Sequence, residues 1–153
     1  KDNREAAMTL DSYIRSLRGK TVSVVGLGVS NRPLLRLLLD AGYAVTVRDK
    51  RTRDRFGEEE AAALENAGCR LVLGEAYLAG LTEDVIFRTP GLHPFTPELA
   101  AAKERGAVLT SEMEAFFAVC PCRIIAVTGS DGKTTTTTMI SELLKAQGYI
   151  TAK

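Results

Sequence analysis

The stretch TVSVVGLGVSN, residues 21–31, decides the fold class of this chain. It opens with a run of β-branched and apolar residues, which is typical of a buried strand, and a helical pattern begins at Asn31. Between the two, Gly26 permits a tight bend, and Gly28 lacks a Cβ, so that backbone can approach a ligand. The first N–H groups of the following helix are then free to meet a phosphate. The stretch therefore predicts a strand–turn–helix unit of the nucleotide-binding type.

The same alternation of short β-branched runs and longer helical patterns continues along the chain, and it predicts an α/β fold with a Rossmann-like, mostly parallel sheet covered by helices. We expect strands at residues 21–25, 44–48, 70–73, 84–88, 107–109 and 123–127. We expect helices at residues 31–41, 58–67, 97–105, 111–118 and 134–147, after an N-terminal helix at about residues 4–17.

Several expected helix ends have their own chemical signals. Thr96 offers a hydroxyl N-cap before Pro97, and Ser111 with Glu114 forms a capping-box pattern in which Glu114 reaches back to the Ser111 amide. A glycine that favours φ > 0 follows four of the helices, at Gly42, Gly68, Gly106 and Gly148.

Composition limits the classes of function. Of the 153 residues, 45% are hydrophobic and 25% charged, which indicates a folded globular protein. Twenty basic residues nearly balance nineteen acidic ones, so there is no overall field for nucleic acid or an anionic membrane. No apolar run reaches the roughly 20 residues of a membrane span, and no signal peptide opens the sequence. We expect a cytoplasmic monomer.

The cysteines and the single histidine give no sign of a disulfide framework or a zinc site. Cys69, Cys120 and Cys122 are odd in number and lack paired spacing, so we expect buried or idle thiols. His93 has no Ser or Cys partner signature, and we interpret it as a loop or surface residue.

Two further features belong to the first glycine-rich turn. Asp49 ends the second expected strand roughly 20 residues on, where an acidic side chain commonly meets a ribose hydroxyl or a base. Pro90-Gly91 predicts a type II turn with φ > 0 at Gly91, at the end of a later strand. Because ligand-binding loops gather at the C-terminal ends of parallel strands, we expect Gly28, Asp49 and this turn to share one edge.

The segment IIAVTGSDGKTT, residues 124–135, gives the stronger signal. A hydrophobic stretch enters a loop with two glycines and Gly-Lys-Thr before a helix, as in a triphosphate-binding P-loop, although Val127 replaces the usual first glycine. Lys133 is expected to reach the phosphates and the Thr134 hydroxyl to ligate Mg²⁺. Five consecutive threonines, residues 134–138, are poor helix formers and favour a functional loop. We therefore expect a Rossmann-like domain at residues 1–119 and a truncated start of an ATP-binding domain at 120–153.

Taken together, GLGVSN, the following Asp49, TPG, SEMEAFF and VTGSDGKTTTT resemble the Mur ligases over nearly the whole chain from about residue 21. Within the family the chain is most similar to the D-glutamate-adding branch. The resemblance implies that the N-terminal domain binds the UDP part of UDP-N-acetylmuramoyl-L-alanine. It assigns the diphosphate to Gly28, Val29, Ser30 and Asn31, the uracil to Asp49 and Lys50, and closure over the nucleotide to Thr89, Pro90 and Gly91.

For the second glycine-rich loop the resemblance implies an ATP site. It comprises Gly129, Ser130, Asp131, Gly132, Lys133, Thr134 and Thr135, with Lys133 and Thr134 as catalytic residues and Thr134 on Mg²⁺. The family reaction forms an acyl phosphate from ATP and the substrate carboxylate, and the D-glutamate amine then displaces phosphate. Further magnesium ligands and the D-glutamate site are not in these residues, so we expect no ligase activity from this chain alone.

Two other interpretations remain open. Gly26, Gly28 and Asp49 are also compatible with a Rossmann NAD(P) domain of an oxidoreductase, although Asn31 stands where such domains have a third glycine. The second loop alone is compatible with a noncatalytic P-loop regulatory or assembly module.

Overall fold

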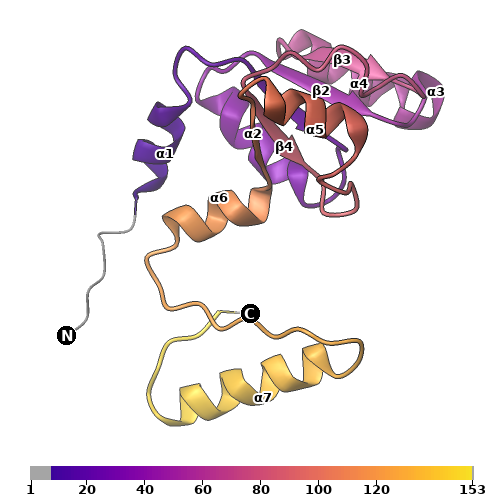
Figure 1. Cartoon of the computed structure of the whole chain (residues 1–153). Coiled ribbons are helices and arrows are strands. Elements are labelled where there is room, and N and C mark those ends of the chain that lie inside the picture. The colour runs from indigo at the N-terminus through magenta and orange to yellow at the C-terminus, as the bar shows by residue number, and fades with distance from the viewer. Residues whose placement is uncertain (1–7, 153) are drawn as a thin grey trace. The chain divides into compact units, whose positions relative to one another are not determined.

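The computed structural model describes residues 8–152, in which five parallel strands form one sheet (Figure 1). The strands are β1 (Val22–Val25), β2 (Val45–Asp49), β3 (Arg70–Leu73), β4 (Val85–Arg88) and β5 (Val108–Thr110). Their order across the sheet is β3-β2-β1-β4-β5, so the expected α/β fold with a parallel, Rossmann-like sheet is confirmed. β1 lies at the centre, with Val24 paired to Val47 on one side and to Phe87 on the other.

The described part of the chain contains seven helices, six in the unit of the sheet and α7 in the C-terminal part. They are α1 (Leu10–Ser16), α2 (Asn31–Asp40), α3 (Arg53–Phe56), α4 (Glu58–Asn66), α5 (Pro97–Glu104), α6 (Glu112–Val119) and α7 (Lys133–Ala146). Six match the expected helices to within a few residues, while residues 4–7 of the expected N-terminal helix lie outside the described residues. The short helix α3 was not expected. None of the described helices is long and apolar enough to cross a membrane.

The two faces of the sheet have separate cores. On one face, Val24, Val47 and Phe87 pack with Leu34 and Leu38 of α2. On the other face, Val25 and Ile86 of the strands pack with Leu99 and Ala102 of α5 and with Leu78 and Leu81 of the crossover from β3 to β4. This division follows the strand period of two, because successive side chains of β1 and β4 point to opposite faces. Helices α2 and α5 therefore cover different faces of the sheet.

The crossover between β3 and β4, residues 74–84, contains no helix and is held by a buried arginine. Arg48 of β2, only 2% exposed, donates to the carbonyl oxygens of Tyr77, Ala79 and Gly80 at 2.9–3.0 Å. It also pairs with the buried carboxylate of Glu83 at 3.0 Å. In a helix or strand these carbonyl oxygens would accept from backbone N–H groups. In this crossover they accept from the Arg48 side chain instead.

Two expected helix and turn details are wrong, and a third, the capping box at Ser111, is confirmed in its Ser111 cap alone. Thr96 makes no side-chain cap, because its hydroxyl donates to the His93 carbonyl at 2.7 Å, although Pro97 does occupy the first helical turn. The turn itself forms, since the Leu92 N–H donates to Thr89 O at 3.0 Å and Gly91 is its third residue, but Gly91 does not have the positive φ that a type II turn requires at that position. At Ser111 the hydroxyl accepts from the Glu114 N–H and donates to the Glu114 carboxylate, so the carboxylate meets the hydroxyl rather than the amide. The four helix-end glycines do have positive φ.

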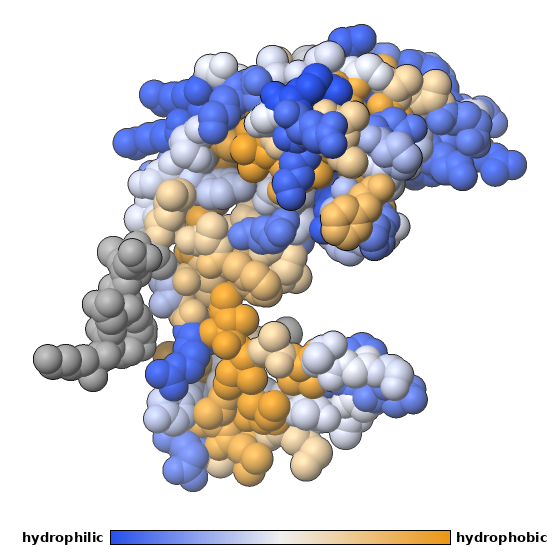
Figure 2. All heavy atoms as spheres, viewed as in Figure 1, coloured by the Kyte–Doolittle hydropathy of each residue, from blue (hydrophilic) through white to orange (hydrophobic). Residues whose placement is uncertain are grey.

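The chain divides into two compact units, residues 1–121 and 122–153. In the second unit the expected strand at 123–127 is absent, and this expectation was wrong. A strand needs a hydrogen-bonded neighbour, and the described residues of this unit supply only α7 and loops. Ile124 and Ile125 are therefore exposed by 42% and 51%, and Figure 2 shows orange side chains gathered over this unit.

Candidate functional site

The strand order places the expected ligand loops at one edge of the sheet. It reverses at β1, whose neighbours are β2 and β4, and such a switch point is where open α/β sheets bind ligands. The turn after β1, Asp49 at the end of β2, and the Thr89–Gly91 turn after β4 all follow the C-terminal ends of these neighbouring strands. The expectation that these three features share an edge is confirmed.

Gly26 joins the first and third of these loops. It has φ +80°, and its N–H donates to the Arg48 carbonyl at 2.7 Å. A Cβ built at this position would lie 2.7 Å from Thr89 Cγ2, closer than any real contact. The Thr89 N–H in turn donates to Val25 O at 2.9 Å. Only glycine satisfies both the backbone angle and the close approach, so the two loops are held against each other.

Beyond Gly26 the turn opens. A Cβ added at Gly28 would meet nothing within 4 Å, Val29 is 89% exposed, and the Ser30 side chain makes no capping hydrogen bond to α2. The first turn of α2 contains no acidic residue. Unpaired N–H groups at the start of a helix, with no carboxylate on its first turn, favour an anion. We call residues 28–31 the α2 cradle.

Asp49 holds this turn from the neighbouring strand. Its Oδ2 accepts from the Leu27 N–H at 2.9 Å, and its Oδ1 accepts from the Arg51 N–H at 2.9 Å. The Arg51 guanidinium adds two bonds of 2.9 Å to the same carboxylate. Burial alone would raise the pKa of Asp49, but these hydrogen bonds and the Arg51 charge outweigh it and lower the pKa. Asp49 is therefore ionised and engaged with the turn.

The sequence patterns did not predict Arg51 as a residue of the site. Besides its bonds to Asp49, it donates to the Leu27 carbonyl at 2.9 Å, and its guanidinium lies 4.7 Å from the ring centroid of Phe56. The side chain is still 38% exposed, so it presents a cation beside the open edge. Its only sequence signal is an arginine two residues after a strand-end acid. Lys50, which was expected to share the site, is exposed.

Asn31 takes part in the cradle differently from its neighbours. It is the first residue of α2 and only 1% exposed. Its side-chain amide donates to the Gly26 carbonyl at 2.9 Å and lies 3.5 Å from Val25 O. Its side chain is thus turned into the protein, whereas the exposed Val29 and Ser30 face outward.

The turn after β4 is compact and mostly exposed. Arg88 donates to the Leu92 carbonyl at 3.0 Å, and Gly91 has open space where a Cβ would be. His93 is exposed, and its ring lies 5.3 Å from that of Phe95 in a tilted arrangement, in agreement with a loop residue. A cavity of about 650 Å³ lies beside this turn, between Arg88, Phe95 and Lys103.

The second glycine-rich loop lies in the other compact unit. Gly129 and Gly132 have φ of +150° and +73°, and α7 begins directly at Lys133. Lys133 Nζ donates to the carbonyl oxygens of Gly129 and Ser130 at 2.6 and 3.0 Å. Its ammonium group therefore lies over the loop itself. Glycine conformations and a helix start of this kind fit a phosphate-binding loop.

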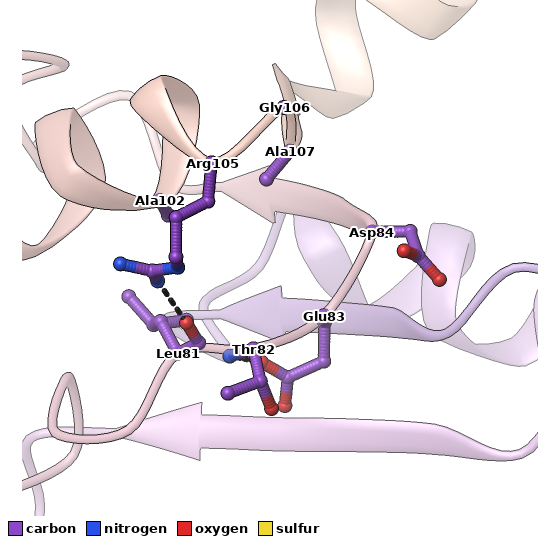
Figure 3. A pocket seen from close by; sticks show the side chains of 8 residues that line it. All are labelled: Leu81, Thr82, Glu83, Asp84, Ala102, Arg105, Gly106 and Ala107. Carbon is purple, nitrogen blue, oxygen red and sulfur yellow. Dashed lines mark hydrogen bonds between the residues drawn. The ribbon is translucent and has the colours of Figure 1, made fainter.

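A smaller pocket of about 80 Å³ lies at the opposite end of the strands (Figure 3). Its charged side chains have internal partners: Glu83 binds Arg48, Asp84 accepts from the Thr21 N–H and hydroxyl, and Arg105 donates to the Leu81 carbonyl. The Asp84–Thr21 contact joins the N-terminal ends of β4 and β1. We interpret the pocket as structural.

Comparison with known proteins agrees with this geometry. The family model described as Mur ligase MurD-like, N-terminal domain, matches residues 20–111. A UDP-N-acetylmuramoylalanine–D-glutamate ligase of Clostridium botulinum is 51% identical over 136 residues, which are 88% of this chain and 30% of the relative. Its counterpart in Clostridium kluyveri is 47% identical over 140 residues, 91% of this chain and 30% of the relative.

A solved structure is also similar, namely the murein peptide ligase Mpl from Psychrobacter arcticus 273-4, with a TM-score of 0.52 and 25% identity. The match covers 85% of this chain and 27% of that one. The chain thus spans about 30% of the length of the curated ligases it matches. With a family model matching more than half of its residues, the chain belongs to the Mur ligases and contains their MurD-like N-terminal domain.

Proposed function

We propose that this chain binds the uridine diphosphate portion of UDP-N-acetylmuramoyl-L-alanine, as part of an ATP-dependent ligase that adds D-glutamate in peptidoglycan precursor synthesis. The observation that supports it most is the open α2 cradle at the switch point of a sheet whose family is that of the Mur ligases. The relatives at 51% and 47% identity are named as ligases of this reaction.

The chemistry of the edge suits a nucleoside diphosphate. In this proposal the N–H groups of Val29 and Ser30, which lead into a helix without a first-turn acid, receive the diphosphate, and Gly28, which lacks a Cβ, lets it approach the backbone. The Asn31 N–H belongs to the same turn. Asp49 and Lys50 are proposed to meet the uracil; because the Asp49 carboxylate is bonded to Leu27 and Arg51, it accepts the imide N–H only in exchange for one of these bonds. Thr89, Pro90 and Gly91 close the nucleotide from β4.

In the second unit we propose an ATP site at residues 129–135. Gly129, Ser130, Asp131 and Gly132 form the loop around the phosphates, and Thr135 completes the first helical turn. Lys133 meets the phosphates as a point charge, and the Thr134 hydroxyl holds Mg²⁺. Mg²⁺ held there would neutralise charge on the phosphoryl group, which is the chemistry that formation of an acyl phosphate needs. Because both ligands are nucleotides of the cell interior, we place the protein in the cytoplasm, as a monomer without nucleic-acid or membrane partners.

Ligand titration separates this proposal from an oxidoreductase domain. We expect the 153-residue chain to bind UDP and not NADH. In dinucleotide-binding domains the third glycine of the motif allows the helix to pack closely on the strand, and Asn31 occupies that position here. Isothermal titration calorimetry with each nucleotide measures both. Binding of NADH without UDP would replace our proposal by the Rossmann NAD(P) interpretation, and binding of ATP alone would favour a noncatalytic P-loop module.

Catalysis by the same chain gives a second test. We expect no amide product from the 153-residue chain with ATP, Mg²⁺, UDP-N-acetylmuramoyl-L-alanine and D-glutamate, because its match spans only 30% of the related ligases. Mass spectrometry of the reaction mixture detects the product, and a full-length relative serves as the positive control. Formation of the amide would show that these residues suffice for ligation.

A further inference from the structure

Asn31 makes contacts that its place in the glycine-rich motif does not suggest. It is 1% exposed, and its Nδ2 donates to the Gly26 carbonyl at 2.9 Å, with the Val25 carbonyl at 3.5 Å. These are the last carbonyl of β1 and the first of the turn. The Val25 carbonyl also accepts from the Thr89 N–H at 2.9 Å. One side chain therefore connects the start of α2 to the end of β1 and, through Val25, to the β4 turn.

The orientation of this amide is fixed by its neighbours. Both contacts are carbonyl oxygens, so a flipped amide would place Oδ1 against two acceptors. In the present orientation Oδ1 is buried and has no hydrogen-bond partner among the described residues. A buried acceptor without a partner costs free energy of folding. The two contacts made by Nδ2 offset this cost.

We infer that Asn31 is a positioning residue of the α2 cradle, whose side chain sets the phosphate-binding N–H groups of residues 29–31 while not touching the ligand itself. The inference rests on the proposed binding of a uridine diphosphate at this edge. It differs from a direct contact because the side chain is buried beneath the turn.

The physical link runs through the Gly26 carbonyl. Gly26 begins the bend, and the Gly28 N–H is bonded to the same carbonyl oxygen at 3.0 Å. Without the Asn31 amide this carbonyl keeps only the Gly28 N–H as a partner, so the peptide units that direct the following N–H groups lose one of the contacts that fix them. Hydrogen-bond donors aimed at a phosphate lose most of their value when they are misdirected. Asp49 and Arg51 hold the same turn from the β2 side, where Asp49 accepts from the Leu27 N–H.

The test compares UDP with uridine on the 153-residue chain. For Asn31→Ala we expect about 10-fold weaker UDP binding, the effect of losing the hydrogen bonds that order the cradle. Uridine lacks the diphosphate, and its binding should change less than 2-fold by this reasoning. Calorimetry gives the UDP affinity, and NMR titration gives that of uridine.

Two variants provide the controls. Ile86→Val removes one methylene from the core on the α5 face, and should lower the melting temperature without changing UDP affinity. Asn31→Ser retains a short donor, and should bind UDP with intermediate affinity; it also serves if Asn31→Ala does not fold.

Each outcome is decisive. Loss of UDP affinity with uridine affinity kept supports the positioning role. Unchanged UDP affinity in both Asn31 variants, or equal loss for UDP and uridine, overturns it while the proposed function stands. Failure of the unsubstituted chain to bind UDP overturns the proposed function first, and the positioning role with it.

Discussion

Replacement of Lys133 by alanine in the full-length ligase is expected to lower turnover on the order of 10³-fold, the scale of removing a cation from a phosphoryl-transfer site. Lys133 is the first residue of α7, and its ammonium lies 2.6 Å from the Gly129 carbonyl and 3.0 Å from that of Ser130. In the proposed function this charge meets the ATP phosphates, where negative charge must be neutralised as the acyl phosphate forms. No neighbouring side chain in the 129–135 loop is basic, so nothing local replaces it.

The same variant should leave uridine-nucleotide binding unchanged, since the α2 cradle belongs to the other compact unit. Lys145→Ala is the matched control: this lysine lies in the last turn of the same helix and pairs with Glu142 at 3.0 Å. It should retain near-normal turnover. Coupled assay of phosphate release gives kcat for each protein. A Lys133→Ala enzyme with turnover similar to that of Lys145→Ala would exclude the assigned role of Lys133.

The features of the site that follow local rules could be predicted from the sequence. Gly26 and Asp49 follow short β-branched runs, and parallel strands bring their ends to one edge, so this edge was foreseeable. What the sequence did not reveal is how Asp49 is used. Its carboxylate holds the Leu27 N–H and Arg51, a pairing that depends on the order of β1 and β2.

Other features depend on contacts distant in sequence. The crossover at residues 74–84 has no helical or strand pattern in its sequence. Its structure could not be predicted because its carbonyls accept from Arg48, about 30 residues earlier. The expected strand at 123–127 shows the opposite limit: its apolar pattern is correct for a strand, but a strand forms only beside a hydrogen-bonded neighbour. Pattern alone predicts the tendency of a segment, and the partners decide its structure.

The largest effect on stability is expected from the buried Arg48–Glu83 pair. Arg48 and Glu83 are 2% and 7% exposed, and the carboxylate accepts from Arg48 Nε at 3.2 Å and from Nη2 at 3.0 Å. It also accepts from the Thr82 N–H at 3.1 Å. Glu83→Ala leaves a buried guanidinium with only carbonyl partners, and should destabilise the fold by about 3–5 kcal/mol. That is a large part of the roughly 5–15 kcal/mol that holds a typical domain folded.

A second substitution distinguishes an uncompensated charge from a simple cavity. Adding Arg48→Met to Glu83→Ala removes the stranded charge, so the double variant should regain part of the lost stability although more atoms are missing. An exposed ion pair supplies the control: Glu58, which pairs with Arg53 at the surface, should change stability little when replaced by alanine. Urea unfolding followed by circular dichroism measures all four proteins. If the double variant is less stable than Glu83→Ala, the loss of the three Arg48 bonds to crossover carbonyls outweighs the relief of the unpaired charge, and the proposed charge penalty is wrong.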